Sequence, residues 1–141
     1  MSVKVNQTAL SLHDEKQPKT DWLQLEKVIV DRGSKYSITA GKVTNNAELK
    51  AFLKRVKSNK KYAKATHNTY AARVMRDGQI FDVKNDDGEI GAGMVILRQL
   101  RKANAVNTAV VVTRWYGGVK LHADRFRHVQ DGTQIILKEV L

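Results

Sequence analysis

One stretch of the chain restricts its fold more than any other: residues 108–113, Thr-Ala-Val-Val-Val-Thr, are almost wholly apolar or β-branched. A strand of this composition has apolar side chains on both faces, so other elements must cover both faces. We therefore expect it to be the central strand of a sheet, ending at Arg114. Its apolar run is far shorter than the roughly 18 to 20 residues that a membrane span requires, so no contact with a membrane is expected.

Two β-hairpins are predicted before this strand. Arg32-Gly33-Ser34 and Asp77-Gly78 are short turn sequences, and the residues around each are rich in β-branched and aromatic types. Such a pattern is typical of antiparallel strands joined by a tight turn. The strands are expected at residues 28–30, 36–43, 66–75 and 80–83.

Three amphipathic helices are predicted from apolar residues that recur at helical spacing. The first begins at Asn45, which with Glu48 three residues later resembles a capping box. The second opens after Gly91 and Gly93, and the third has Asp124 as its expected N-cap. The buried stripes are expected to be Leu49, Phe52, Leu53 and Val56; Ile96, Leu97, Leu100 and Ala103; and Phe126, Val129, Ile136, Leu137 and Val140.

This order of elements, ββα, ββα, βα, predicts an α+β fold. We expect an α/β two-layer sandwich in which two or three helices pack on a mixed sheet. Residues 1–25 are polar and hold the only proline, Pro18, so they are expected to be a flexible leader outside the core. Residues 26–141 are then the folded domain. The chain has no cysteine and no signal-peptide pattern, so it is expected in the cytoplasm.

The charge balance is strongly basic. Lys and Arg number 25 against 14 Asp and Glu, which makes the formal net charge +11. Such a balance favours polyanionic partners, including RNA and the ribosome. The densest basic stretch, opposed only by Glu48, supplies the candidate nucleic-acid contacts Lys50, Lys54, Arg55, Lys57, Lys60, Lys61 and Lys64.

The acidic turn Asp86-Asp87-Gly88-Glu89 admits two interpretations. Its carboxylates are of the type that binds a hard cation or forms an acid/base pair. The favoured alternative is that Gly88 makes a tight turn while the carboxylates lie near the positive N-terminus of the following helix. The chain has no HExxH, GxSxG or P-loop motif, so we expect no metal, no cofactor and no enzymatic activity.

The segment Arg114-Trp115-Tyr116-Gly117-Gly118-Val119-Lys120 combines two aromatic residues and two cations with a glycine pair at the end of the central strand. Loops at strand ends often carry binding sites, so this segment is a candidate contact surface. The aromatic residues could equally cap the core while the glycines turn the chain. The residues alone leave both interpretations open.

Three blocks of the sequence together resemble one protein family. They are ATHNTYAARV from Ala65, DDGEIGAG from Asp86, and VVVTRWYGGVKL followed by DRFRHV from Val110 to Val129. These blocks resemble the IMPACT domain, which eukaryotic IMPACT proteins share with bacterial YigZ. The resemblance covers about Lys35 to Leu141 and is closer to the eukaryotic branch, although His122 and Ala123 depart from the glycine-containing family pattern.

The resemblance implies a fold similar to the second domain of ribosomal protein S-five and a cytoplasmic, non-enzymatic regulator of translation. Eukaryotic relatives restrain the general-control kinase of the amino-acid starvation response by competing for its ribosome-associated scaffold, and they also bind actin. They carry an RWD domain before this one, for which the leader is expected to be too short. The implied partner-binding surface is His67, Asn68, Asp86, Asp87, Gly88, Glu89, Arg114, Trp115, Tyr116, Gly117, Gly118, Lys120, Asp124, Arg125 and Phe126.

Overall fold

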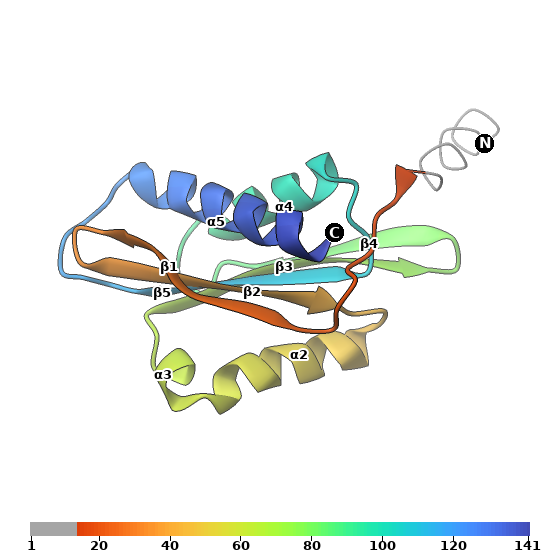
Figure 1. Cartoon of the computed structure of the whole chain (residues 1–141), viewed down its shortest axis with the longest axis horizontal. Coiled ribbons are helices and arrows are strands. Elements are labelled where there is room, and N and C mark those ends of the chain that lie inside the picture. The colour runs from red at the N-terminus through yellow and green to blue at the C-terminus, as the bar shows by residue number, and fades with distance from the viewer. Residues whose placement is uncertain (1–13) are drawn as a thin grey trace.

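A five-stranded sheet forms the middle layer of the protein (Figure 1). The structure is a computed structural model, and it describes residues 14–141. Neighbouring strands pair in the order β1-β2-β5-β3-β4. The strands are β1 (Leu23–Asp31), β2 (Ser34–Lys42), β3 (His67–Arg76), β4 (Gln79–Asn85) and β5 (Thr108–Trp115). Both predicted hairpins are therefore confirmed, and β5 is the central strand.

The predicted mixed sheet is wrong, because all four strand pairs are antiparallel. β2 and β3 run in the same direction, but they do not pair with each other. β5 lies between them and is antiparallel to both. The helical connection from β4 to β5 therefore places β5 beside β3 instead of making a parallel pair with β4.

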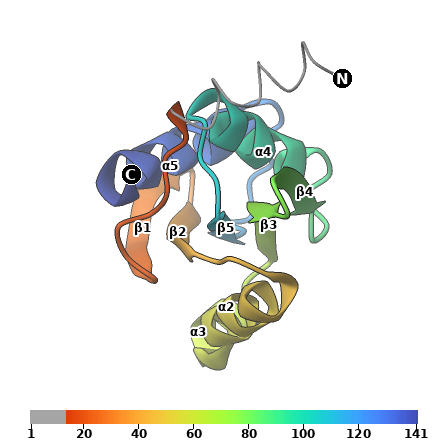
Figure 2. The same cartoon turned by 90° about the vertical axis from the view of Figure 1, so that its right-hand side faces the viewer.

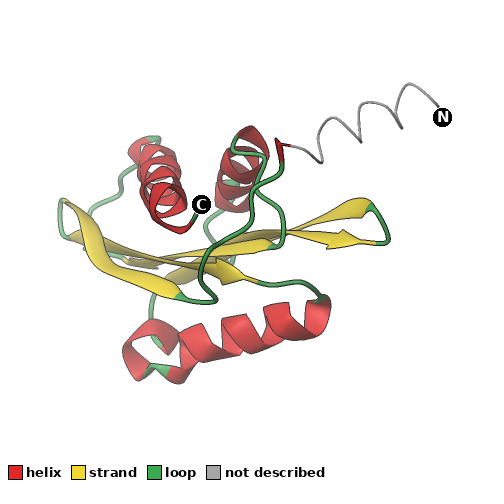
Figure 3. Cartoon of the chain, turned by 45° about the vertical axis from the view of Figure 1, so that its right-hand side comes forward, coloured by secondary structure: helices red, strands yellow, loops and turns green. Residues whose placement is uncertain are grey.

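Helices cover both faces of the sheet, so the protein has three layers instead of the predicted two (Figure 3). Figure 2 shows α4 and α5 on one face and α2 and α3 on the other. From β1 onward there is one helix more than expected, because the short helix α3 follows α2. The Asn59 side chain caps α3 by accepting a hydrogen bond from the Lys61 N–H. The helices are α2 (Asn46–Ser58), α3 (Lys60–Ala63), α4 (Ala92–Lys102) and α5 (Asp124–Val140).

The central strand joins two hydrophobic clusters, one on each face. Val110 and Val112 pack with residues of α4 and α5. Ala109 and Val111 pack with residues of α2 and α3. Helices thus cover both faces of β5, as its apolar composition predicted.

The helix starts agree only in part with the predicted caps. Asn45 caps α2 by accepting a hydrogen bond from the Glu48 N–H at 2.8 Å, but the Glu48 carboxylate accepts from the N–H of Thr44 instead of Asn45. Helix α5 has Ala123 at its N-cap. Asp124 is not the cap, because its carboxylate instead accepts a hydrogen bond from Arg32 at 2.6 Å.

The predicted boundary at residue 26 falls too late. β1 begins at Leu23, whose side chain packs against the larger core cluster. Before it, the backbone of Lys16 pairs with the loop after α4, and the Lys19 N–H donates to the Val140 carbonyl. Pro18 is buried. Residues 14–25 therefore belong to the folded domain, and the rest of the predicted leader lies outside the described residues.

Candidate functional site

An open groove of about 630 Å³ lies at the end of β5. Three parts of the chain meet there: the start of β3, the turn between β4 and α4, and the segment from the end of β5 into α5. We call it the Glu89 groove; its lining residues are Thr66, His67, Gly88, Glu89, Ile90, Arg114, Tyr116, Lys120, Leu121, His122 and Arg125.

Strand register explains why Arg114 and His67 lie side by side in the groove. Arg114 on β5 is paired with Tyr36 on β2 and with His67 on β3, so the three side chains form a row across the sheet. Residues directly opposite one another in antiparallel strands share a face. The Arg114 guanidinium lies 5.5 Å from the centroid of the Tyr36 ring. The two hairpins and the central strand thus place this row where the α5 helix begins.

Glu89 is the anion at the centre of the groove, and only 4% of its side chain is exposed. Arg114 Nη1 donates to both carboxylate oxygens, at 2.8 and 3.1 Å. His67 Nε2 lies 3.0 Å from Oε2, and Arg125 Nε lies 3.3 Å from Oε1. A buried carboxylate requires this kind of compensation, because its transfer out of water is costly.

Both ring nitrogens of His67 face oxygen atoms. Nδ1 lies 2.8 Å from the main-chain carbonyl of Asp87, and Nε2 faces the Glu89 carboxylate. A carbonyl oxygen only accepts, and so does an ionised carboxylate, so this geometry suits the doubly protonated ring.

Two buried donors at the groove are not hydrogen-bonded to described residues. They are the Nε atoms of Arg114 and Arg125. The Arg125 contact with Glu89 falls within ion-pair distance but does not meet the geometry of a hydrogen bond. The Tyr36 hydroxyl also has no partner among these residues, and burial raises the pKa of Tyr36 to about 12. These buried donors therefore lack a hydrogen-bond acceptor among the described residues.

The acidic turn is divided between two roles. Asp86 accepts hydrogen bonds from the N–H groups of Gly91 and Gly93 at the start of α4, at 2.9 and 2.8 Å. The Gly91 hydrogen bond, more than any other contact, lowers the pKa of Asp86. This part of the favoured interpretation, a carboxylate at the helix N-terminus, is confirmed. Glu89 instead turns toward the sheet to pair with Arg114.

The groove brings together seven of the fifteen residues of the predicted partner surface: His67, Gly88, Glu89, Arg114, Tyr116, Lys120 and Arg125. Another six, Asp86, Asp87, Gly117, Gly118, Asp124 and Phe126, lie next to these in the chain without lining the groove.

The remaining two residues lie on the other face of the sheet. Asn68 is buried, and its amide donates to the Tyr62 carbonyl. Trp115 packs edge-on against Tyr62 and donates to the Lys61 carbonyl. Asn68 and Trp115 therefore lie beside α3 and outside the Glu89 groove, because alternate residues of a strand point to opposite faces.

The two interpretations of the aromatic loop both apply, to different residues. Trp115 caps the smaller core cluster, whereas Tyr116 lines the groove and remains 47% exposed. The glycine that follows is needed for a close approach: a Cβ atom on Gly117 would collide with the backbone of Gly33, at the turn between β1 and β2.

Sequence reasoning did not place Thr66, Ile90, Leu121 or His122 in the groove. For Ile90 there was a signal, since it is a large apolar residue in an otherwise polar turn. It is 77% exposed, the highest value among the exposed large hydrophobic residues in the described part of the chain. His122 adopts a left-handed backbone conformation with φ 52°, which favours glycine.

The seven candidate nucleic-acid contacts form a separate basic face on α2, α3 and the residue that follows. All seven are exposed, and this face lies across the sheet from α4 and α5 (Figure 2). Arg55 also has a structural role, since its guanidinium lies 4.0 Å from the centroid of the Trp22 ring.

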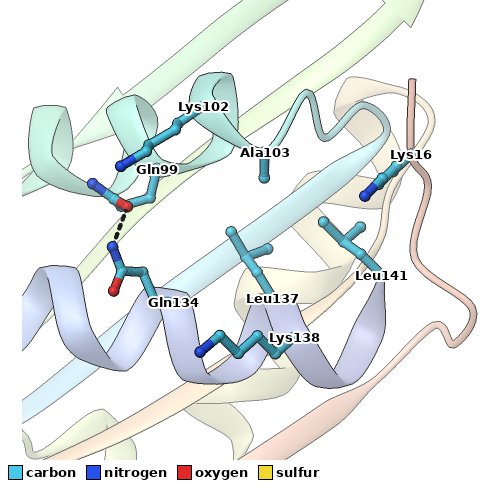
Figure 4. Close-up of a pocket in the computed structure, with 8 residues that line it drawn as sticks. All are labelled: Lys16, Gln99, Lys102, Ala103, Gln134, Leu137, Lys138 and Leu141. Atoms are coloured by element: carbon cyan, nitrogen blue, oxygen red, sulfur yellow. Dashed lines mark hydrogen bonds between the residues drawn. The ribbon is translucent and has the colours of Figure 1, made fainter. Parts of the chain in front are cut away.

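A second cleft, of about 370 Å³, lies between α4 and α5 near their C-terminal ends. Gln134 donates a hydrogen bond to Gln99 across it at 2.9 Å, and the lysines Lys16, Lys102 and Lys138 line it (Figure 4). Lys138 is about 20 Å along α5 from Arg125. Within residues 14–141 no group of three or more His, Asp or Glu side chains could hold a metal ion. No helix in the same range is long and apolar enough to cross a membrane.

Known proteins share both the sequence and the fold. Protein IMPACT of Mus musculus is 39% identical over 137 residues, which is 92% of this chain and 42% of the relative. The Schizosaccharomyces pombe IMPACT homolog is 36% identical over 118 residues, with 83% and 42% covered. The chain thus spans about two-fifths of the length of these relatives.

Two solved structures share the fold. The two-domain translational regulator Yih1 matches with a TM-score of 0.59 and 31% identity, over 89% of this chain and 49% of that one. A crystal structure of a hypothetical protein matches with a TM-score of 0.76 and 23% identity, over 88% and 60%. The Impact N-terminal domain model matches residues 32–137. The chain therefore belongs to the Impact N-terminal domain family.

Proposed function

We propose that this protein is a non-enzymatic regulator of translation that acts in the cytoplasm by binding a protein partner through the Glu89 groove. The observation that carries the proposal is the convergence of three separated family blocks on one groove, with Glu89 held at its centre by Arg114, Arg125 and His67. The similarity to the translational regulator Yih1 supports the process in which it acts.

The proposed partner is the ribosome-associated scaffold of the general-control kinase. By occupying the scaffold, the protein would restrain the kinase during amino-acid starvation. Actin is the second proposed protein partner. The groove suits this role, because it is open and joins exposed apolar and charged residues.

The test is binding of the purified protein to purified scaffold fragments and to actin, followed by kinase output in starved cells. Arg125→Glu reverses a charge in the groove, and Lys138→Glu makes the same kind of change at the far end of α5. We expect Arg125→Glu alone to weaken scaffold binding and to release the kinase. Equal binding by wild type and both variants would contradict the proposal.

A second candidate function, RNA or ribosome binding, is favoured by the basic face. Its seven exposed cations are opposed only by Glu48 within that stretch. If phosphate contacts drive binding to single-stranded RNA, the logarithm of the binding constant should fall linearly with the logarithm of the salt concentration. The slope should be roughly −0.7 for each contacted phosphate. Joint replacement of Lys50, Lys54 and Lys57 by alanine should flatten that slope, and RNA binding that ignores salt would dismiss this function.

A further inference from the structure

The Glu89 groove includes exposed apolar side chains. Ile90 and Tyr116 line the groove and are 77% and 47% exposed, and Val119, three residues after Tyr116, is 45% exposed. These three residues come from two different loops, which the fold of the sheet brings to one end of β5. Gathered apolar residues rimmed by polar ones are typical of surfaces that bind another molecule.

Beside these apolar side chains the groove is cationic. Arg114, Lys120 and Arg125 line it together with a single carboxylate, that of Glu89, so its net charge is +2 before its two histidines are counted. The Glu89 carboxylate pairs mainly with Arg114, which donates hydrogen bonds to both of its oxygens. Lys120 is exposed, and one-third of the Arg125 side chain is exposed although its Nε lies 3.3 Å from a carboxylate oxygen of Glu89. Arg125 and Lys120 therefore present positive charge to an incoming group.

We propose that the occupant of the groove is an acidic segment of a partner protein that also contains a large apolar side chain. Its carboxylates would pair with Arg125 and Lys120, and its apolar side chain would rest on Ile90 and Tyr116. This inference rests on the proposed protein-binding role of the groove and adds the chemistry of the partner.

A nucleic acid fits this groove less well than an acidic peptide. The buried Glu89 carboxylate would repel a run of phosphates, whereas a peptide can place one or two carboxylates beside the cations and avoid it. Exposed Ile90 also offers apolar contact, which a phosphate backbone does not use. The seven cations of the basic face, on the other side of the sheet, are the better surface for a polyanion.

The test uses fluorescence anisotropy with a short labelled peptide of alternating glutamate and leucine residues. Matched peptides replace every glutamate by glutamine or every leucine by serine, and a labelled single-stranded RNA is the third comparison. We expect the parent peptide to bind about tenfold more tightly than either altered peptide. Neither Lys120 nor Ile90 is part of the Glu89 ion cluster, so Lys120→Glu and Ile90→Ser should keep the fold and weaken binding severalfold. Lys138→Glu should leave binding unchanged.

Each outcome decides between the proposals. Equal binding of all three peptides, or peptide binding that Lys120→Glu and Lys138→Glu weaken alike, would overturn the acidic-segment proposal. So would RNA binding that competes with the peptide and is lost in Lys120→Glu. If the peptides fail but scaffold binding still depends on Arg125, the proposed function stands and only the partner chemistry is wrong. If scaffold binding is also independent of Arg125, both proposals fall.

Discussion

Glu89 and Arg114 show how a single buried charge organises the site. With 4% and 6% of their side chains exposed, neither is solvated well enough to stand alone. Their pairing has a structural consequence: it ties the turn after β4 to the central strand. Arg125 and His67 approach the same carboxylate, so the charge also joins α5 and β3 to that turn.

Glu89→Gln should therefore be strongly destabilising. The change keeps the size of the side chain but leaves Arg114 buried without an anion, which costs about 3–5 kcal/mol. Urea unfolding followed by circular dichroism measures the effect. Glu139→Gln, the same change at an exposed position of α5, should alter stability by less than about 0.5 kcal/mol. Equal stability of the two variants would show that the buried cluster contributes nothing.

Asp86 predicts a pH dependence of stability that a solvated carboxylate would not give. Its hydrogen bonds to the start of α4 lower its pKa below 3.8 in the folded state. A lowered folded pKa adds stability above the unfolded pKa, and this stability is lost as the pH falls through the folded pKa. Asp86→Asn should therefore be less stable than wild type at pH 7, and the gap should close in acid. Unfolding curves across this range, with Asp77→Asn as an exposed control, check the prediction.

Among the packed elements, helix α5 lies close against the sheet at Gly132. A Cβ atom there would collide with Ile38 of β2, reaching its Cδ1 and lying 3.1 Å from its Cγ1. Ile38 is fully buried, so its side chain has little room to move. The glycine that interrupts the helical pattern in sequence is thus required by packing.

Gly132→Ala tests this contact. In an open helix interior, this change stabilises by about 1 kcal/mol. Here we expect it to destabilise by about 1–3 kcal/mol, because the added methyl group overpacks the core. Ile38→Val removes the colliding Cδ1, so the double variant should be less destabilised than the sum of the single variants. A double-mutant cycle of urea unfolding measures the coupling, and simple additivity would contradict the packing account.

At the scale of the whole molecule, the segment before β1 connects the two helical layers. Lys16 and Lys19 bond to the loop after α4 and to the end of α5, on one face of the sheet. Trp22 then packs on Phe52 of α2, on the other face, with ring centroids 5.1 Å apart. The segment runs past the edge of the sheet between the layers (Figure 1).

Trp22→Ala should weaken this connection. Loss of the contacts with Phe52 and Arg55 is expected to cost about 2–3 kcal/mol, at the lower end for a large aromatic residue because Trp22 is only partly buried. Val28→Ala, on the exposed side of β1, serves as the control and should change stability by less than about 0.5 kcal/mol. Equal urea midpoints for the two variants would mean that the segment merely lies against the domain.

Local patterns predicted most elements. The β-branched run of β5, the Asp77-Gly78 turn and the Asn45 cap depend on neighbours in the chain, so residue spacing is enough to identify them. The start of the domain was missed, because residues 14–22 have no apolar period and are held mainly by backbone hydrogen bonds and by Trp22. The prediction of Asp124 as the N-cap of α5 was wrong, because Arg32 on the β1–β2 turn donates a hydrogen bond to the Asp124 carboxylate.

Residue order along the chain was enough to predict a central strand covered on both faces, to identify the three family blocks and to locate one strongly basic stretch. These are properties of composition and spacing. Long-range strand pairing puts β5 between β2 and β3, which places Tyr36, Arg114 and His67 in one row. It also decided that Trp115 faces the core while Tyr116 faces the groove. Strand order and the face of each side chain depend on long-range pairing, because a shift of one residue reverses every face.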